Sequence, residues 1–584
     1  MQEKFCNMSI SEKNRKIIEE KLTFIYGEKR SKKIIIEIEK LIKKYSKNIS
    51  FQNKKKTFLD EKDIILITYG DSIKETNKKP LKTLCRFIDK YLTGQINIVH
   101  ILPFYPYSSD DGFSVIDYKK VNPVLGEWKD IEEINQKINL MLDLIANHIS
   151  SKSTWFKEYL KDNPEYDNYF TSIDKDADIS SVIRARAHPL LTKFKRKSEE
   201  IYLWTTFSPD QIDLNYANEK VLIEVIDVTL FYAGKRARVI RLDAIGHIWK
   251  KLGTSCINLK ETHYIIQLIR TILDEVYPEV LLVTETNVPH EENINYFGNG
   301  YNEAQLIYQF ALPLLVLHTF YAGDASRLFE WASKIKDTSD KTTFLNVLAT
   351  HDGLGVVPVT NILTDKEITD IANDVKEKGG YVSYKIEKDG TEKPYEMNVT
   401  YYSAITDPKN SDKLNIKKFI ASQAIILSLI GIPGIYIHSL FGTENYLKGV
   451  ERTGRKRTIN RKKLQYDKLK ENLENTNSGE HKIFNKFMRL IQKRKSEKAF
   501  HPNGKQEVLF LKKELFSLLR TSPSGEERII ALHNITDNMQ ELCLRKNQYN
   551  LSKKQYYDII SEKIINIEKI SLKPYQIMWL KVFK

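Results

Sequence analysis

Four short apolar runs, each leading into polar or charged side chains, constrain the fold of this chain most strongly. The runs and the side chains that follow them are 140–146 with Asn147 and His148, 239–242 with Asp243, 281–284 with Glu285, and 348–350 with His351 and Asp352. Short apolar runs of this kind are typical of strands buried in a parallel sheet. Polar groups that end successive strands build the active face of a (β/α)₈ barrel. The sequence therefore predicts an α/β protein with a (β/α)₈ TIM barrel.

Further apolar runs supply the other four strands of the predicted barrel. Strands one, two, six and eight are expected at residues 64–69, 96–102, 306–310 and 435–438. Two polar stretches, at about 150–218 and about 355–408, are too long for ordinary βα loops. They predict inserted lobes after strands three and seven, the second of which contains a turn at residues 387–390.

The chain of 584 residues is too long for one hydrophobic core. Residues 10–45 show helical periodicity, and after about residue 501 short alternating runs are typical of β structure. We predict an N-terminal helical extension (1–60), a catalytic barrel (61–500) and a C-terminal antiparallel β domain (501–584).

Residues 419–443 carry no charge and are long enough for a transmembrane helix. Gly431, Pro433 and Gly434 interrupt them, so we predict a buried helix, the strand 435–438 and no membrane insertion. Residues 1–14 are polar and show no secretory leader. The four cysteines, Cys6, Cys85, Cys256 and Cys543, are scattered, which predicts reduced thiols in a cytoplasmic protein.

The net charge of +15 raises the question of nucleic-acid binding. The lysines are spread over the chain among acidic residues, and we predict no nucleic-acid partner. Two local basic runs lie at residues 54–56 and 455–463, and we interpret the first as a solvated loop. A basic chain would also suit an anionic small-molecule substrate.

Two of the strand-terminal carboxylates predict chemistry on an acetal. One carboxylate can attack the anomeric carbon while the other protonates the leaving oxygen, and a retaining site holds them about 5–5.5 Å apart. Neighbouring strands four and five could place Asp243 and Glu285 at that separation. Arg241 lies two residues before Asp243, so it points to the same side of the strand and could hold Asp243 ionised.

The regions 143–148, 241–247, Glu285 and His351-Asp352 resemble the four conserved regions of the α-amylase superfamily of glycoside hydrolases, family 13. The resemblance implies that Asp243 is the nucleophile and Glu285 the general acid/base. It also implies that Asp352 binds sugar hydroxyls in the transition state, with His148 and His351 on the same ring.

Other segments are similar to the sucrose phosphorylase branch of that family. Residues 103–113 resemble the segment that closes the glucose subsite, in which Asp110 matches a sugar-binding aspartate and Phe113 an aromatic platform. Gly-Thr-Ser-Cys at 253–256 is a second signature, and Arg461 matches the arginine that grips the far end of glucose with the aspartate. This resemblance implies a blind pocket for one glucose unit. We interpret the rest of run 455–463 as a solvated loop.

Within the branch, residues 184–191, 284–293 and 438–442 and the N-terminal extension look closest to glucosylglycerate phosphorylases. Tyr395-Glu396 stands where sucrose phosphorylases have tyrosine and glutamine in an acceptor loop, which weakens the case for fructose. Arg186 is the candidate countercharge for phosphate or glycerate, because a guanidinium can bind either anion through two hydrogen bonds.

The resemblance thus predicts phosphorolysis of a small α-glucoside, with glucosylglycerate favoured, to α-D-glucose 1-phosphate through a β-glucosyl intermediate on Asp243. Phosphorylases of sucrose, sucrose 6-phosphate or glucosylglycerol stay open, as does a hydrolase or transglucosylase. The complete carboxylate set argues against a non-catalytic binding protein. Related amylases bind calcium near the Asn147-His148 motif, but no surrounding carboxylate cluster demands it, so we predict no metal and no cofactor. A homodimer is left open.

Overall fold

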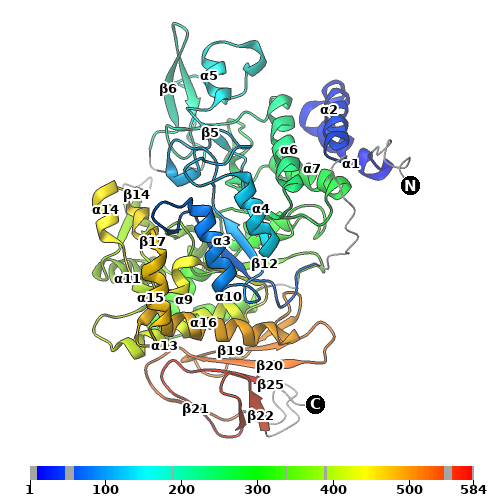
Figure 1. The fold of residues 1–584 in the computed structure, drawn as a ribbon. Helices are drawn as coiled ribbons and strands as arrows, with labels where there is room; N and C mark the ends of the chain where they lie inside the picture. The colour runs from blue at the N-terminus through cyan, green and yellow to red at the C-terminus, as the bar shows by residue number, and fades with distance from the viewer. Residues whose placement is uncertain are drawn as a thin grey trace.

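The computed structural model describes residues 10–46, 58–186, 188–335, 338–386, 391–544 and 555–581 (Figure 1). At its centre eight parallel strands close into a barrel, because neighbours along the chain pair in order and β16 pairs with β1. The strands are β1 (Ile65–Thr68), β3 (Ile98–Ile101), β4 (Asn139–Ile145), β9 (Ala237–Asp243), β10 (Leu281–Thr284), β11 (Leu306–Tyr308), β12 (Thr343–Val347) and β16 (Ile432–Tyr436). The predicted (β/α)₈ TIM barrel is confirmed.

The register of three neighbouring strands places acidic side chains in one row. Asp143 of β4 pairs with Arg241 of β9, and Leu242 pairs with Thr284 of β10. Glu285 follows Thr284 directly and its backbone N–H donates to the carbonyl of Leu242. Since paired residues in a parallel sheet point to the same side, the acids of β4, β9 and β10 meet at the carboxyl end of the barrel.

Helices surround the barrel, most of them between successive strands and three of them, α14, α15 and α16, after the last strand β16. Several begin at side chains that accept a hydrogen bond from the first turn, as Asn218 does for the amide of Lys220 and Ser411 for that of Leu414. The helices are α3 (Pro80–Tyr91), α4 (Trp128–Lys137), α6 (Glu219–Gly234), α7 (Lys260–Val276), α8 (His290–Asn293), α9 (Leu312–Ala322), α10 (Ser326–Ser333), α13 (Asp412–Ser428), α14 (Leu447–Thr453), α15 (Tyr466–Glu474) and α16 (Gly479–Lys495).

Two helices precede the barrel, α1 (Glu12–Tyr26) and α2 (Glu28–Ser46), and Gly27 separates them with a φ of +80°. They pack against α7 and α6 (Figure 1). Tyr26 at the end of α1 is buried, and its hydroxyl donates to the carbonyl of Tyr216 at 2.7 Å. The predicted helices are confirmed over these ranges, whereas the basic run 54–56 lies outside the described residues.

The first inserted lobe follows β4 and lies at one end of the molecule (Figure 1). It contains the pair β5 (His148–Ser150) and β8 (Gln211–Asp213), the hairpin β6 (Leu191–Arg196) and β7 (Glu199–Trp204), and α5 (Thr154–Leu160). The second insertion contains β13 (Leu354–Gly355), α11 (Asp365–Glu377), β14 (Tyr381–Ile386), β15 (Glu392–Asn398) and α12 (Tyr401–Ile405). The predicted turn at 387–390 lies outside the described residues.

An antiparallel sheet at the opposite end of the molecule forms the C-terminal part (Figure 1). Its strands are, in order, β18 (Lys505–Val508), β19 (Leu515–Thr521), β20 (Arg528–Asn534), β25 (Ile577–Lys581), β22 (Gln555–Asp558) and β23 (Lys563–Asn566), and β21 (Gln540–Leu542) pairs with β24 (Ile570–Leu572). The sheet contacts α13 through β20. The predicted antiparallel β structure is confirmed, while the domain boundaries after residues 60 and 500 stay predictions.

The eighth strand begins earlier than predicted. It starts at Ile432, and the break lies at Gly431, where φ is +115° and a Cβ atom would meet the carbonyl oxygen of Phe344 at 2.6 Å. Gly434 lies inside the strand because a Cβ atom there would come within 2.8 Å of Val347. Among the described helices, including α13 just before this strand, none is long and apolar enough to cross a membrane.

Strands three and seven end before the residues at which we predicted their ends. β4 stops at Ile145, and His148 begins the separate strand β5. β12 stops at Val347, and Asp352 lies in the loop beyond it. The backbone carbonyls of that loop accept hydrogen bonds from side chains and not from a neighbouring strand. The Asn460 amide donates to the carbonyls of Thr350 and Asp352, and the Arg461 guanidinium donates to that of His351.

Candidate active site

The guanidinium of Arg241 lies at the centre of the carboxylate cluster. Its Nη1 donates to Asp143 Oδ1 at 2.5 Å and to Asp243 Oδ1 at 2.7 Å, and its Nη2 lies 3.9 Å from Glu285 Oε2. The predicted contact between Arg241 and Asp243 is present. One fully buried cation thus holds the row of acids at the ends of β4, β9 and β10.

Asp143, for which the sequence suggested no function, binds Arg241 through one carboxylate oxygen. Its second oxygen lies 2.7 Å from His100 Nε2 on β3. Burial acts to raise the pKa of Asp143, but His100 and Arg241 outweigh it and lower that pKa to about 2. Asp143 therefore stays ionised and fixes the orientation of Arg241.

Asp243 experiences opposite influences. Burial raises its pKa well above the usual range, the Arg241 guanidinium lowers it, and the carboxylates of Glu285, Asp143 and Asp352 raise it again. Such interacting carboxyl groups titrate as a set rather than one by one. The cluster therefore favours keeping a proton among these carboxyl groups, and a general acid needs such a proton.

Asp352 faces a second guanidinium, that of Arg457. Arg457 Nη1 lies 2.5 Å from Asp352 Oδ1 and its Nη2 lies 2.6 Å from Glu396 Oε1. Burial acts to raise the pKa of Asp352, but Arg457, with His351 and Arg461, lowers it far below the usual range. The pKa of Glu396 is also lowered, because Arg457 and Arg186 outweigh its burial. Both carboxylates are thus ionised.

The residues predicted for the glucose subsite lie together. Phe113 stacks on His351 with ring centroids 4.7 Å apart, and its carbonyl oxygen lies 3.1 Å from His148 Nε2. Burial lowers the pKa of His148 and His351, which favours neutral rings. A neutral imidazole has one N–H donor and one acceptor nitrogen, so both rings could hydrogen-bond to sugar hydroxyls.

Arg461 pairs with Asp111, the neighbour of the predicted sugar-binding aspartate Asp110. Arg461 Nη1 binds Asp111 Oδ2 at 2.6 Å, whereas Asp110 accepts a 3.4 Å contact from Gln211 Nε2. The backbones of Asp110 and Asp111 have φ of +52° and +48°, so this short turn sets which carboxylate reaches the arginine. The joint grip of Asp110 and Arg461 on the far end of glucose stays a prediction.

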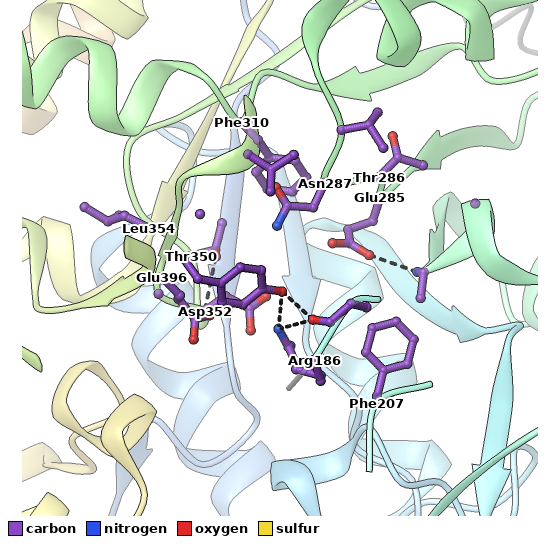
Figure 2. Close-up of a pocket in the computed structure, with 18 of the residues that line it drawn as sticks. Arg186, Phe207, Glu285, Thr286, Asn287, Phe310, Thr350, Asp352, Leu354 and Glu396 are labelled. Atoms are coloured by element: carbon purple, nitrogen blue, oxygen red, sulfur yellow. Dashed lines mark hydrogen bonds between the residues drawn. The ribbon is translucent and has the colours of Figure 1, made fainter. Parts of the chain in front are cut away.

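A cavity of about 210 Å³ lies beside the carboxylate cluster. Glu285 lies across it from Asp352 and Glu396, and Arg186 projects from the inserted lobe (Figure 2). Arg186 Nη1 donates to Tyr395 Oη at 3.0 Å, and its guanidinium lies 5.7 Å from the ring centroid of Phe207. Arg186, Tyr395 and Glu396 all line the cavity, as expected for acceptor-site candidates.

Among the described residues, no group of three or more His, Cys, Asp or Glu side chains could hold a metal ion. Beside the Asn147-His148 motif, oxygen atoms surround the Lys250 ammonium instead. Its Nζ lies 2.6 Å from Asn147 Oδ1 and 2.7 Å from Asp213 Oδ2, and it also donates to the carbonyl of His247. The Lys250 ammonium thus supplies the positive charge beside these oxygen atoms. The absence of a metal stays a prediction.

Arg457 is the functional candidate that the sequence interpretation missed, because we took it for part of a solvated loop. It lies in the short 3₁₀ helix Lys456–Asn460, four residues before Arg461. That spacing places both arginines near Asp352. The four-residue spacing from Arg461 was the sequence feature that could have identified Arg457. The same helix also supplies Asn460 to the loop that carries Asp352.

Taken together, the barrel and its site define a class of protein. Two interacting carboxyl groups at the ends of adjacent strands, a buried arginine and a pocket with aromatic and imidazole rings are what cleavage of a glycosidic bond requires. The alpha-amylase catalytic domain matches residues 68–367 of the chain. The chain therefore belongs to the α-amylase family.

Individual relatives show which members of the family the chain is similar to. The chain is 48% identical over 483 residues to a glucosylglycerate phosphorylase of Spirochaeta thermophila, a match that covers 83% of this chain and 82% of the relative. It is 44% identical to a glucosylglycerate phosphorylase of Allomeiothermus silvanus, over 98% of this chain and 99% of the relative. A solved sucrose 6F-phosphate phosphorylase from Thermoanaerobacter thermosaccharolyticum has the same fold, with a TM-score of 0.71, 24% identity, and coverage of 90% and 99%.

Proposed function

We propose that this enzyme catalyses the retaining phosphorolysis of glucosylglycerate, giving α-D-glucose 1-phosphate and glycerate. The central observation is the Arg241 guanidinium, which lies within 4 Å of both Asp243 and Glu285 beside a cavity lined by arginines. The relatives that match most of the chain support the choice of glucosylglycerate and phosphate as substrates.

In the first step, an oxygen of Asp243 attacks the anomeric carbon and the bond to the glycerate oxygen breaks. Glu285 gives its proton to that oxygen, so glycerate leaves as the alcohol. Arg241 donates to Asp243 at 2.7 Å and opposes the effect of burial on it, which favours the carboxylate form that attacks. The product is a β-glucosyl ester of Asp243.

In the second step, an oxygen of hydrogen phosphate attacks the same carbon from the opposite face. The ester bond to Asp243 breaks, and Glu285 takes the phosphate proton. Two inversions give the α anomer. Asp352, His148 and His351 would hold the sugar ring, with Phe113, Asp110 and Arg461 at its far end.

Phosphate and glycerate both carry negative charge, and both have to occupy the cavity beside Asp352 and Glu396. Arg186 is our candidate for binding them, since no carboxylate among the described residues lies within ion-pairing distance of it. Its contact with Tyr395 holds the guanidinium at the cavity wall. An arginine held in this way can bind a carboxylate or a phosphate through two hydrogen bonds.

The reverse reaction tests this proposal. α-D-Glucose 1-phosphate is supplied with D-glycerate, fructose, fructose 6-phosphate, glycerol or no acceptor, and phosphate release is followed. We expect fast release with D-glycerate. Preference for fructose would make the enzyme a sucrose phosphorylase, and equal release in every tube would make it a hydrolase.

We also propose that the enzyme acts in the cytoplasm without a metal, a cofactor or a nucleic-acid partner. Cys85, Cys256 and Cys543 are free thiols, as expected for a reducing compartment, and Cys6 lies outside the described residues. The homodimer that the sequence leaves open stays a prediction.

A further inference from the structure

Arg457 holds two carboxylates at once on the wall of the cavity. One of its terminal nitrogens binds Asp352 at 2.5 Å and the other binds Glu396 at 2.6 Å. The side chain is 21% exposed, so it is neither a solvated surface group nor sealed in the core. Both of its carboxylate partners are visible on the same side of the cavity in Figure 2. Both terminal nitrogens of Arg457 thus have a carboxylate partner.

A bound glucosyl unit would disturb one of these two contacts. Under the proposed function, Asp352 binds sugar hydroxyls, and its Oδ1 already has Arg457 at 2.5 Å and Arg461 at 3.8 Å. A hydroxyl that donates to the same oxygen competes with Arg457 for it. The Nη1 donor of Arg457 then needs another acceptor, because a buried charged donor without a partner is costly.

The contact between Arg457 and Glu396 can persist when a glucosyl unit binds. Glu396 lies on β15, and its side chain crosses directly over Gly353, where a Cβ atom would come within 2.6 Å of Glu396 Cγ. The glycine thus makes room for the glutamate to approach Arg457. Asn398 Nδ2 approaches the other oxygen of Glu396 at 3.4 Å. Glu396 can therefore hold Nη2 while Nη1 changes its partner.

We propose that Arg457 determines the specificity for anionic acceptors, and that it does so by moving one N–H donor from Asp352 to an oxygen of the incoming anion while Glu396 retains the other. This inference rests on the proposed function and extends it. Arg186 would contact the same anion from the inserted lobe, so two guanidiniums from separate parts of the chain would bind one carboxylate or phosphate.

A neutral donor separates this role from the chemistry of bond cleavage. α-D-Glucosyl fluoride glucosylates the enzyme and releases only fluoride, so neither a carboxylate nor a phosphate occupies the acceptor site. Transfer from the glucosyl enzyme is then measured to D-glycerate, to phosphate, to glycerol and to water, for the wild type, Arg457→Gln and Arg455→Gln. Arg455 belongs to the same basic run but is exposed and does not line the cavity, so it is the matched control.

In Arg457→Gln we expect the ratio of kcat/KM for D-glycerate to kcat/KM for glycerol to fall about 10- to 100-fold, the effect of losing a charge-assisted hydrogen bond. The ratio of phosphate to glycerol should fall likewise, and Arg455→Gln should keep both ratios. Arg457→Lys keeps the charge but not the forked donor, so it should give intermediate ratios and replaces Arg457→Gln should that variant not fold.

Unchanged ratios in Arg457→Gln would overturn the inference, even with all rates lower, because Arg457 would then act only by positioning Asp352. A fall in the glycerate ratio with an unchanged phosphate ratio would restrict the contact to the carboxylate and overturn the shared site. Failure of the proposed function would appear separately, as a wild type that does not favour D-glycerate over glycerol.

Discussion

Both ends of the barrel bury arginines, and Arg494 and Arg520 at the amino end have partners of another kind than the arginines of the carboxyl end. At the carboxyl end, Arg241, Arg457 and Arg461 each contact carboxylates. At the opposite end, Arg494 and Arg520 are fully buried and donate to backbone carbonyls, with no carboxylate within ion-pairing distance among the described residues. The first group holds charges that chemistry needs, and the second holds the chain together.

Arg494 and Arg520 connect segments that are distant in sequence. Arg494 on α16 donates to the carbonyls of Leu427 at 3.0 Å and Gly431 at 3.1 Å, and also to that of Glu61 before β1. Arg520 on β19 donates to the carbonyl of Ser428 at 2.7 Å. These carbonyls end α13 and precede β16, so the two guanidiniums satisfy a helix terminus that would otherwise be orphaned.

The pKa values reflect the same contrast. Burial lowers the pKa of Arg494 to about 10 and that of Arg520 to about 9. Burial also acts to lower the pKa of Arg241, but Asp143 and Asp243 outweigh it and raise that pKa. Stabilising contacts thus gather at one end of the barrel and reactive charges at the other, as in (β/α)₈ enzymes generally.

The largest expected effect is at Asp243. Asp243→Asn keeps the shape of the side chain but removes the nucleophile, and we expect kcat to fall by about 10⁴-fold or more. The apparent unfolding temperature should stay the same or rise, because burial and three neighbouring carboxylates disfavour the ionised Asp243. Kinetics with α-D-glucose 1-phosphate and thermal unfolding check both parts. A variant with near wild-type kcat would break the assignment.

Arg494→Met tests the opposite end. Loss of its donors leaves buried carbonyls unsatisfied, so the free energy of unfolding should fall by about 3–5 kcal/mol, with kcat per folded molecule unchanged. Arg489→Met is the control on the same helix, since its side chain is 57% exposed and contacts Glu562 at the surface. Urea unfolding should show a loss below about 1 kcal/mol there. Equal losses of unfolding free energy in both variants would show that the buried Arg494 stabilises the fold no more than the exposed Arg489.

Asp143 gives a smaller effect that depends on pH. Its pKa in the folded protein, about 2, lies below the ordinary value of 3.8, so its carboxylate stabilises the fold above pH 4. This contribution is lost as the pH falls through 2. Between pH 5 and pH 3 the wild type should therefore lose about 1 kcal/mol more unfolding free energy than Asp143→Asn. A difference that does not change with pH would show that Asp143 is not held ionised.

The smallest expected effect is that of a chelator. Lys250 Nζ already binds the oxygens of Asn147 and Asp213, so dialysis against EDTA should leave kcat and the unfolding temperature unchanged. Loss of activity that added calcium restores would contradict this result.

The barrel could be predicted from the sequence because each strand is buried on both faces and appears as a short apolar run. Asp243 and Glu285 could be predicted for the same reason, since each directly ends or follows its strand. Asp352 was predicted as a site residue, although it lies five residues beyond Val347 in a loop that side chains hold.

Contacts between distant segments were harder to predict. The choice between Asp110 and Asp111 for Arg461 depends on two consecutive residues with positive φ, which apolar patterns do not reveal. Arg457 and Glu396 are 61 positions apart, and their contact depends on the space that Gly353 leaves. The ammonium of Lys250 among three oxygens likewise has no signal in local composition.

Phosphorolysis in the forward direction gives the most direct test of the retaining mechanism. The enzyme is incubated with α-D-glucosyl-D-glycerate and inorganic phosphate, and the products are followed by ³¹P and ¹H nuclear magnetic resonance. We expect α-D-glucose 1-phosphate and glycerate in equal amounts, with the α configuration kept and little free glucose. Formation of the β anomer, or of free glucose at the same rate without phosphate, would contradict a retaining phosphorolysis through Asp243.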